Sequence, residues 1–190
     1  MRKTAKFVRK EKIKLVNFRT KSVPNPLYLF HASRLTKTKH LGWMTSVKYQ
    51  DSCGSCTAFA TNAAAETALI KAGADWNSMD LSEQWLLNCS PYGRGCGGAW
   101  PEDYAKWLPT RGVLMHEKDY MYTNSANKDD CKDGPYWNPG YKIDNFIQGS
   151  DCTDKEIMMQ IKEYGSVVMI VDVKGGFKDY KSGVFDGCSK

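Results

Sequence analysis

Residues 50–59 combine the residue types in this chain that are best suited to chemistry: a glutamine, two cysteines three positions apart and a glycine. The run that follows, residues 57–71, is predicted to be helical because its small and apolar residues recur at helical spacing. With Cys56 in the first turn of that helix, the helix dipole and the free N–H groups favour a thiolate. Gln50 lies six residues upstream and can donate a hydrogen bond to an oxyanion. This arrangement predicts an acyl-transfer site with a cysteine nucleophile.

The elements that must position this stretch are predicted to be helices up to about residue 125 and mainly strands after it. The predicted helices before that boundary cover residues 57–71, 81–87 and 101–108. The predicted strands after it cover residues 141–148 and 166–173, with another that begins at residue 184. One further helix lies among the strands and starts with a capping box, Thr153 to Glu156. The order predicts an α+β fold in which a helical lobe precedes a β lobe.

The net charge of +6 is concentrated at the N-terminus of the 190-residue chain. Residues 1–22 hold nine Lys or Arg against one acid, Glu11, so the remaining residues are weakly acidic. We expect this segment to be a weakly ordered basic arm, either a solvated leader or the remnant of a pro-segment. Binding of nucleic acid or of an acidic membrane surface is an alternative for the arm. No nucleic-acid partner is expected, because the arm lacks the aromatic and glycine pattern of an RNA-binding sheet.

Neither a membrane span nor a metal site is predicted. The longest apolar runs fall well short of the roughly 18 residues that a span requires. The basic N-terminus also lacks the apolar core of a secretory signal. Seven cysteines are present, at positions 53, 56, 89, 96, 131, 152 and 188. An odd number leaves at least one thiol unpaired in an oxidising compartment. Only one C-x-x-C pair occurs, so structural zinc is disfavoured and no cofactor is expected.

Residues 50–59 resemble the signature around the nucleophile of the papain/cathepsin-like cysteine peptidase family. Four further motifs resemble the same family in order and spacing, and together they extend the resemblance over roughly residues 41–188. They lie at residues 81–89, at 95–101, at 120–122 before Cys131, and at 180–185 before Cys188. Residues 47–50 resemble the family's lead-in to the nucleophile.

The resemblance implies a two-lobe papain-like fold that is truncated at its C-terminal end. Residues 1–40 would be the basic arm or pro-segment remnant, and residues 41–125 the helical lobe that carries the nucleophile. Residues 126–190 would be the first part of an antiparallel β-barrel lobe, which is incomplete. A second chain or a missing C-terminal segment would then complete the β lobe.

The resemblance also implies roles for individual residues. Cys56 is the nucleophile, and Gln50 donates to the oxyanion together with the N–H of Cys56. The implied disulfides are Cys53–Cys96 and Cys89–Cys131, whereas Cys188 is left free or paired with Cys152. The residues implied to lie along the substrate backbone are Gly54, Gly98 and Ala99. Those implied to shape an apolar specificity pocket are Trp100, Pro101 and Ile170, for which core packing remains an alternative.

Three positions depart from the family pattern. Thr57 stands where the family usually has Trp, Asp51 replaces a Gly, and Ala99 replaces another. A carboxylate close to the nucleophile would raise its pKa. The catalytic His and Asn are expected roughly 130–150 residues after the nucleophile, which is at or beyond about residue 186. None of the histidines present occupies that position; they are His31, His40 and His116.

The function implied is that of a cysteine endopeptidase that hydrolyses peptide bonds through an acyl-enzyme. The chain would be a fragment without the catalytic His and Asn, and alone it would be inactive. The alternative is a catalytically inactive papain-fold protein with a binding or structural role. The implied partner is a peptide or protein substrate, and the implied location is lysosomal, vacuolar or extracellular.

Overall fold

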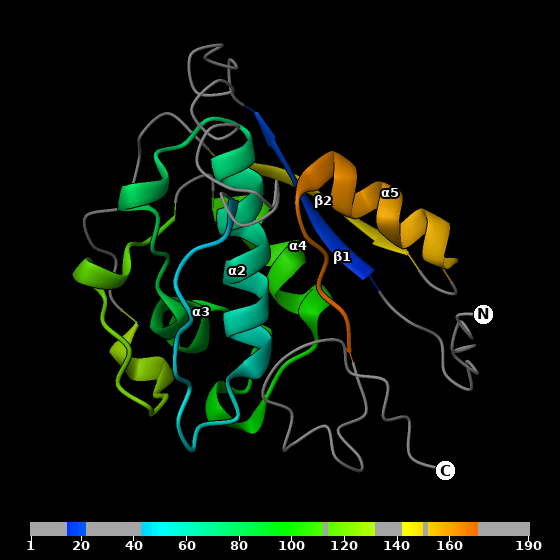
Figure 1. The fold of residues 1–190 in the computed structure, drawn as a ribbon. Coiled ribbons are helices and arrows are strands. Elements are labelled where there is room, and N and C mark those ends of the chain that lie inside the picture. Colours follow the sequence, from blue (N-terminus) through cyan, green and yellow to red (C-terminus); the bar gives the residue numbers. More distant parts are fainter. Residues whose placement is uncertain (1–14, 22–42, 112–113, 132–141, 150–151, 171–190) are drawn as a thin grey trace, which may run out of the picture.

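The structure, a computed structural model, describes residues 15–21, 43–111, 114–131, 142–149 and 152–170. Its α-helices are α2 (Cys56–Lys71), α3 (Glu83–Cys89), α4 (Pro101–Arg111) and α5 (Asp154–Tyr164). Its strands are β1 (Leu15–Lys21) and β2 (Lys142–Gly149). Short 3₁₀ turns cover Trp76–Ser78, Gly95–Gly97, Glu117–Asp119 and Lys128–Asp130. The four helices predicted from the sequence are therefore all present (Figure 1).

Helix α2 runs through the middle of the molecule and contacts α3, α4 and α5 (Figure 1). It is rich in alanine, the best helix former, and its small side chains allow neighbouring elements to approach closely. Ala58, Ala65 and Leu69 have no measurable exposure to solvent. The helix that carries the predicted nucleophile is therefore embedded in the core along most of its length.

The core beside α2 is built mainly from α3 and α4. Trp85 of α3 and Trp107 of α4 pack with ring centroids 4.6 Å apart. Leu86 of α3 and Tyr104 of α4 are buried in the same core. Helix α3 starts at a capped turn, because the Ser82 hydroxyl accepts a hydrogen bond from the N–H of Trp85.

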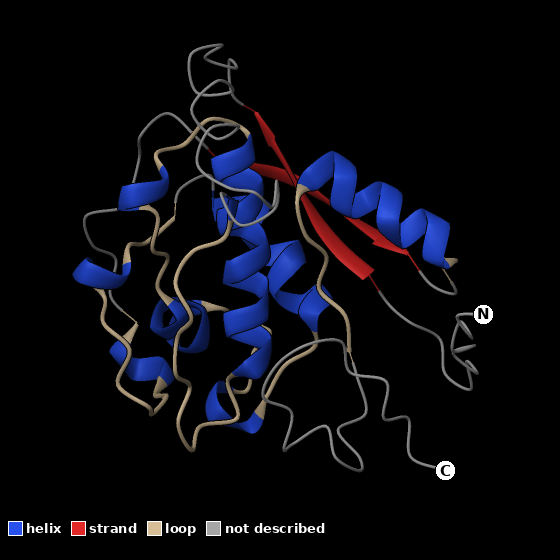
Figure 2. Cartoon of the chain, in the orientation of Figure 1, coloured by secondary structure: helices blue, strands red, loops and turns tan. Residues whose placement is uncertain are grey.

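Strands β1 and β2 form an antiparallel ribbon in which Phe18 is opposite Phe146 (Figure 2). The ribbon contacts α4, and β1 also contacts α2 and α5. The expectation that the whole N-terminal segment is weakly ordered is therefore wrong for Leu15–Lys21. Alternating β-branched and aromatic residues, Val16, Phe18 and Thr20, favour a strand, and pairing with β2 satisfies its backbone groups.

The second half of the chain agrees in part with its predicted elements. Strand β2 matches the strand predicted at residues 141–148, and α5 begins with the predicted capping box at Thr153. The strand predicted at residues 166–173 is not formed over residues 166–170, where Val168 makes only an isolated bridge. An apolar run becomes a strand only where a neighbour pairs with its backbone over several residues. Residues 171–190, with the strand predicted from residue 184, lie outside the described part.

Helix α5 ends at Gly165, which contacts the side chain of Thr67 in α2. Gly165 has φ +101°, a conformation that L side chains rarely adopt, and a Cβ there would lie 2.5 Å from Thr67 Cγ2. Glycine is therefore required at this contact both by its backbone angle and by the space available. Among the described residues, no helix is both long enough and apolar enough to cross a membrane.

Candidate active site

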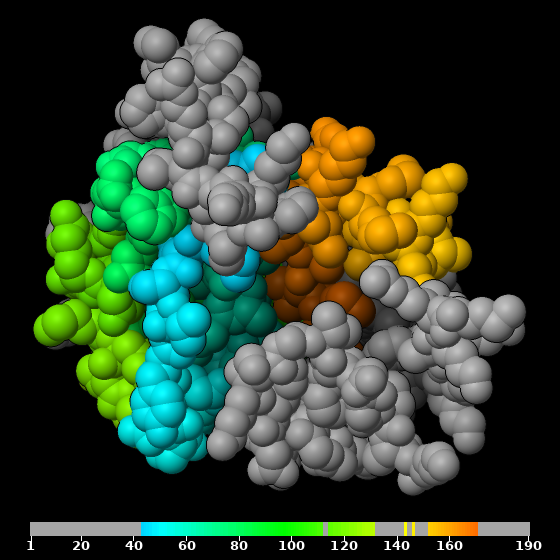
Figure 3. Space-filling model, viewed as in Figure 1, coloured from blue at the N-terminus to red at the C-terminus, as the bar shows by residue number. Residues whose placement is uncertain are grey.

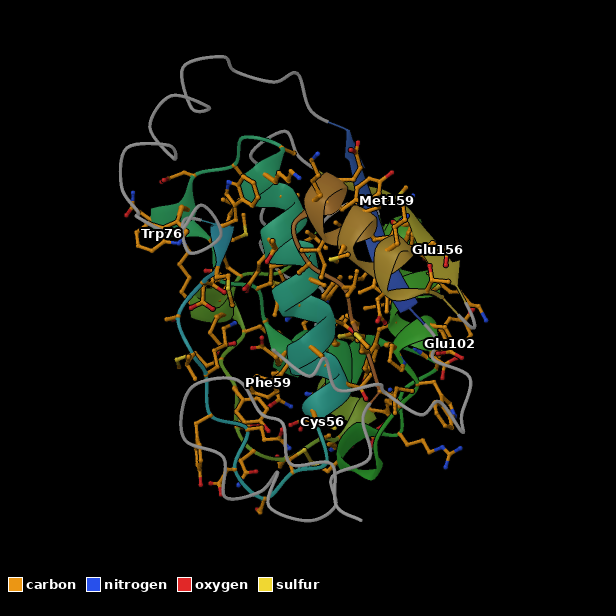
Figure 4. All side chains as sticks on the ribbon, turned by 45° about the vertical axis from the view of Figure 1, so that its right-hand side comes forward. Cys56, Phe59, Trp76, Glu102, Glu156 and Met159 are labelled. Atoms are coloured by element: carbon orange, nitrogen blue, oxygen red, sulfur yellow. A yellow bond between two sulfur atoms is a disulfide. The ribbon has the colours of Figure 1, made fainter. Side chains whose placement is uncertain are left out.

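Cys56 is the first residue of α2, and its thiol is free and exposed. Figure 4 shows it at the lower end of the helix, with Phe59 beside it. The backbone N–H of Cys56 has no hydrogen-bond partner within the described part of the chain. A nucleophilic sulfur and an unpaired N–H donor at a helix N-terminus are therefore presented together to solvent.

The loop before α2 places Gln50 with its side-chain amide held in one orientation. Its Nε2 donates a hydrogen bond to the carbonyl oxygen of Cys53 at 3.0 Å. A glutamine amide has two N–H donors, so one fixes the group and the second remains available. The residue is half-buried and is not the solvated side chain of an ordinary loop.

Residues 120–125 pack against this loop and hold it at several points. The Tyr122 hydroxyl donates to the carbonyl of Gln50 at 2.6 Å and lies 2.7 Å from the hydroxyl of Ser55. The side-chain oxygen of Asn124 accepts a hydrogen bond from the N–H of Cys53 at 3.0 Å. Sequence reasoning recognised the motif at residues 120–122 but assigned it no role. These contacts join residues about 70 apart, which no local pattern shows.

The structure forms both disulfides implied by the family resemblance, Cys53–Cys96 and Cys89–Cys131. The first lies in the nucleophile loop, three residues before Cys56. Among the described residues the free thiols are Cys56 and Cys152. Cys188 lies outside the described part, so its pairing with Cys152 stays a prediction.

Residues 95–101 form a glycine-rich loop, which contacts the stretch that carries the nucleophile, residues 50–59, at two further points. The N–H of Gly54 donates to the carbonyl of Cys96 at 3.1 Å. A Cβ at Gly54 would lie 2.3 Å from that same oxygen, so only glycine allows the approach. The Thr57 hydroxyl donates to the carbonyl of Ala99 at 2.8 Å. Thr57, where the family usually has Trp, therefore ties the start of α2 to the loop predicted to line the substrate.

The three residues predicted to form a specificity pocket differ from one another in their exposure to solvent. Trp100 is 54% exposed and Ile170 is 45% exposed, which excludes core packing for both. Pro101 is buried as the first residue of α4, the position where proline is favoured in a helix. Gly98 has φ +90°, a backbone conformation suited to glycine.

A charge cluster, consisting of Lys48, Glu66, Asp80 and Glu83, anchors the segment that leads into Gln50. Lys48 Nζ lies 3.3 Å from Glu66, 2.7 Å from Asp80 and 2.8 Å from Glu83. Lys48 thereby connects the segment before Gln50 to both α2 and α3. In the space-filling view this segment runs along the surface beside α2 (Figure 3). Sequence reasoning missed the cluster, although an acid inside an alanine-rich helix, Glu66, was a usable signal.

Burial and pairing act in opposite directions on the groups of this cluster. Burial raises the pKa of Glu83 to about 7, against the opposing effect of Lys48. Burial also raises the pKa of Glu66. Burial alone would lower the pKa of Lys48, but the carboxylates of Glu66 and Glu83 outweigh it and the net pKa is raised. The cluster is a structural anchor, because its charges are directed at one another.

Of the three histidines, only His116 falls in the described part. It is buried, its Nδ1 lies 3.0 Å from the carbonyl oxygen of Asp80, and it forms an antiparallel bridge with Leu81. Burial lowers its pKa. These contacts give His116 a structural place beside the charge cluster. The described residues contain no group of three or more His, Cys, Asp or Glu arranged to hold a metal ion.

Comparison with known proteins identifies the family to which this chain belongs. A family model described as papain family cysteine protease matches residues 33–190. The chain belongs to the papain family of cysteine proteases. Its papain-family relatives include gamete and mating-type specific protein A of Dictyostelium discoideum, which is 32% identical over 155 residues. Ananain of Ananas comosus is 34% identical over 148 residues.

This papain-family chain matches only part of those relatives. The two alignments cover 78% and 77% of this chain but 32% and 40% of the relatives. The chain therefore spans about a third to two fifths of their length. A solved cysteine protease of Carica candamarcensis, in complex with E-64, superimposes with a TM-score of 0.60 at 23% identity. That superposition covers 79% of this chain and 68% of the other, and shows that the fold is papain-like.

Proposed function

We propose that this chain is the nucleophile-bearing part of a papain-like cysteine endopeptidase. The observation that carries the proposal is the exposed thiol of Cys56 at the first residue of α2, in a segment that also offers two hydrogen-bond donors. These donors are the unpaired N–H of Cys56 and the second N–H of the Gln50 amide, which Cys53 holds in place.

In the proposed reaction the Cys56 thiolate adds to the carbonyl carbon of a peptide bond. A C–S bond forms, and the carbonyl electron pair moves to the oxygen, which the two donors stabilise. Collapse of this intermediate breaks the C–N bond, and the leaving amine takes a proton from the catalytic acid. Water then hydrolyses the thioester of the acyl-enzyme.

The base and its orienting partner belong to a part of the enzyme beyond the described residues. By the family resemblance, a His and an Asn take these roles, at or beyond about residue 186. We propose that they come from a C-terminal segment or from a second chain, which also completes the β lobe.

The bounds proposed for the lobes are those that the family resemblance implies. Residues 41–125 form the helical lobe, and β2 with α5 begins the β lobe within residues 126–190. Within residues 1–40, which precede both, β1 pairs with β2. The proposed substrate is a peptide or protein, and the proposed location is lysosomal, vacuolar or extracellular.

Labelling with a peptidyl epoxide tests the proposal, because such a reagent needs both a reactive thiolate and a place for its peptide. The full chain carries an internal comparison, since Cys56 and Cys152 are both free thiols. We expect the epoxide to modify Cys56 at least about tenfold faster than Cys152, because the Cys56 thiol is the more exposed of the two and lies at a helix N-terminus. Iodoacetamide, which lacks the peptide, should discriminate less between the two.

Two matched variants complete this experiment. Cys56→Ser should abolish the fast labelling, whereas Cys152→Ser should leave it unchanged. Equal labelling of both thiols would support the alternative, a papain-fold protein without a catalytic site. The exposed carboxylate of Asp51 and the occupied carbonyl of Ala99 are the features that favour this alternative.

A further inference from the structure

Ser55, the residue immediately before Cys56, occupies the N-cap position of α2 but makes no capping hydrogen bond with its side chain. A serine at this position usually accepts from a free N–H of the first turn. Here its hydroxyl lies 2.7 Å from the hydroxyl of Tyr122 instead. The Ser55 side chain, which is best placed to cap α2, is therefore hydrogen-bonded to a tyrosine that is distant in the sequence.

The direction of these hydrogen bonds follows from counting protons. A tyrosine hydroxyl has one proton, and the proton of Tyr122 goes to the carbonyl of Gln50 at 2.6 Å. Ser55 must then donate to Tyr122. One continuous chain of hydrogen bonds thus connects the residue before the nucleophile to the backbone of the proposed oxyanion donor.

Tyr122 is itself firmly held. Its ring packs edge-on against Phe59 of α2, with centroids 5.0 Å apart and an interplanar angle of 81°. Its backbone N–H donates to the carboxylate of Glu117 at 2.7 Å. The next residue, Thr123, donates from both its N–H and its hydroxyl to Gln84 in α3. The hydroxyl of Tyr122 therefore projects from a rigid support.

We propose that Tyr122 is a positioning residue of the active site, which holds Gln50 and keeps the Ser55 hydroxyl from the carbonyl that orients Gln50, so that the Gln50 amide faces the oxyanion. The proposal rests on the proposed function, because it assigns Gln50 to the oxyanion. Removal of the Tyr122 hydroxyl leaves the Gln50 carbonyl without this donor. It also frees the Ser55 hydroxyl, which lies 3.4 Å from the carbonyl of Cys53. That carbonyl is the acceptor that orients the Gln50 amide, so the two donors would compete for it.

A peptide aldehyde measures this positioning directly on the full chain. The Cys56 sulfur adds reversibly to the aldehyde carbon, and the thiol proton ends on the oxygen, which occupies the oxyanion position. We expect Tyr122→Phe to raise the dissociation constant of the aldehyde about five- to tenfold, the effect of one hydrogen bond. The rate of reaction with 2,2′-dipyridyl disulfide, which needs the thiolate but no oxyanion donor, should change by less than about twofold.

Two further variants separate positioning from a general loss of structure. Gln50→Ala should weaken aldehyde binding, and the double variant with Tyr122→Phe should be no weaker than Gln50→Ala alone, because Tyr122 acts through Gln50. Tyr120→Phe is the matched control: it removes a hydroxyl two residues away that bonds Asn88 and the carbonyl of Asp130. It should leave aldehyde binding unchanged. If Tyr122→Phe does not fold, Ser55→Ala removes the hydroxyl that fixes the Tyr122 hydroxyl and should weaken the aldehyde in the same direction but by less, because Tyr122 still donates to Gln50.

The outcomes distinguish this inference from the proposed function. If Gln50→Ala weakens the aldehyde and Tyr122→Phe does not, the positioning role is overturned and the endopeptidase proposal survives. Additive losses in the double variant would also overturn it. If the wild-type chain does not bind the aldehyde, or Gln50→Ala has no effect, the proposed function fails and the positioning role fails with it.

Discussion

The helical region, residues 43–131, supplies nearly all of the buried side chains among the described residues, polar as well as apolar, whereas residues 142–170 supply Ile143 and Val168. In the first region, Gln84 and Asn88 are buried and hydrogen-bonded to the segment that supports the nucleophile loop. In the second, Met158 is 63% exposed and Met159 is 54% exposed, and α5 has no buried residue.

The difference shows where each region obtains its stability. The helical region pairs buried polar groups such as Asn62, Gln84 and Asn88 within itself and is closed by two disulfides. The second region is attached mainly through β1 and α4, and its exposed methionines offer apolar area that a further element could cover. We therefore expect substitutions to be costly in the first region and nearly neutral on the exposed side of the second.

Loss of the Cys53–Cys96 bridge is the largest effect expected. The bridge closes a sequence separation of 43 residues. Replacing both cysteines by alanine should lower the free energy of unfolding by about 4 kcal/mol, by the chain-entropy account. Urea denaturation measures this change, with Cys152→Ala as the control for loss of a thiol. A loss no larger than that of the control would show that the helical region does not depend on its bridge.

Core truncation compares the two regions directly. Leu86 is fully buried in α3, and Leu86→Ala should cost about 3 kcal/mol through lost burial and a residual cavity. Met159→Ala in α5 should cost less than about 0.5 kcal/mol, because that side chain is half exposed. Comparable costs in urea denaturation would contradict the contrast between the regions.

The charge cluster makes the helical region sensitive to pH. The folded-state pKa of Glu83 is raised from 4.5 to about 7, so the folded state binds a proton in this window that the unfolded chain does not. The free energy of unfolding should therefore fall by about 2 kcal/mol as pH rises from about 4.5 through 7. Two charged groups that face this carboxyl also act on its pKa, Lys48 by lowering it and Glu66 by raising it.

Glu83→Gln should remove most of this pH dependence. The lowered pKa of His116 changes stability in the opposite sense, so the difference between wild type and variant isolates Glu83. Denaturation curves at several pH values give that difference. Parallel pH profiles of wild type and Glu83→Gln would show that the carboxyl does not titrate in this window.

A smaller effect, of stabilising sign, is expected at Asp51, where the helical region carries local strain. Asp51 has φ +55°, in the left-handed region that favours glycine. Asp51→Gly should raise the free energy of unfolding by about 1 kcal/mol, because glycine adopts this φ without strain. The larger conformational entropy that glycine loses on folding reduces this gain. Asp51→Ala retains the Cβ and should give no gain. A glycine variant less stable than wild type would mean that the carboxylate makes a stabilising contact.

Local patterns in the sequence were enough to predict the helices and the motif that carries the nucleophile. Helix α5 was predicted from Thr153 and Glu156, a capping box that needs only neighbouring residues. The two disulfides followed from the family resemblance. The high charge of the N-terminal segment predicts a weakly ordered arm and not strand β1. The conformation of β1 depends instead on pairing with β2, more than 120 residues away.

The supports of the site could not be predicted for a similar reason. Tyr122 holds Gln50 across 72 positions, and Lys48 reaches Glu83 across 35. No local periodicity contains such pairs, since they depend on how the helices pack. The departures at Asp51 and Thr57 were visible in the sequence, but their consequences, a positive φ and a hydrogen bond to Ala99, required the structure.

The contact between Gly165 and Thr67 constrains how the sequence of this protein can change. Any L-residue at position 165 would meet the γ-methyl of Thr67 at 2.5 Å, so it could be accepted only after Thr67 had become smaller. Even then the φ of +101° would penalise the new side chain. Positions 67 and 165, nearly a hundred residues apart, are therefore expected to vary together or not at all, and the order in which they mutate matters.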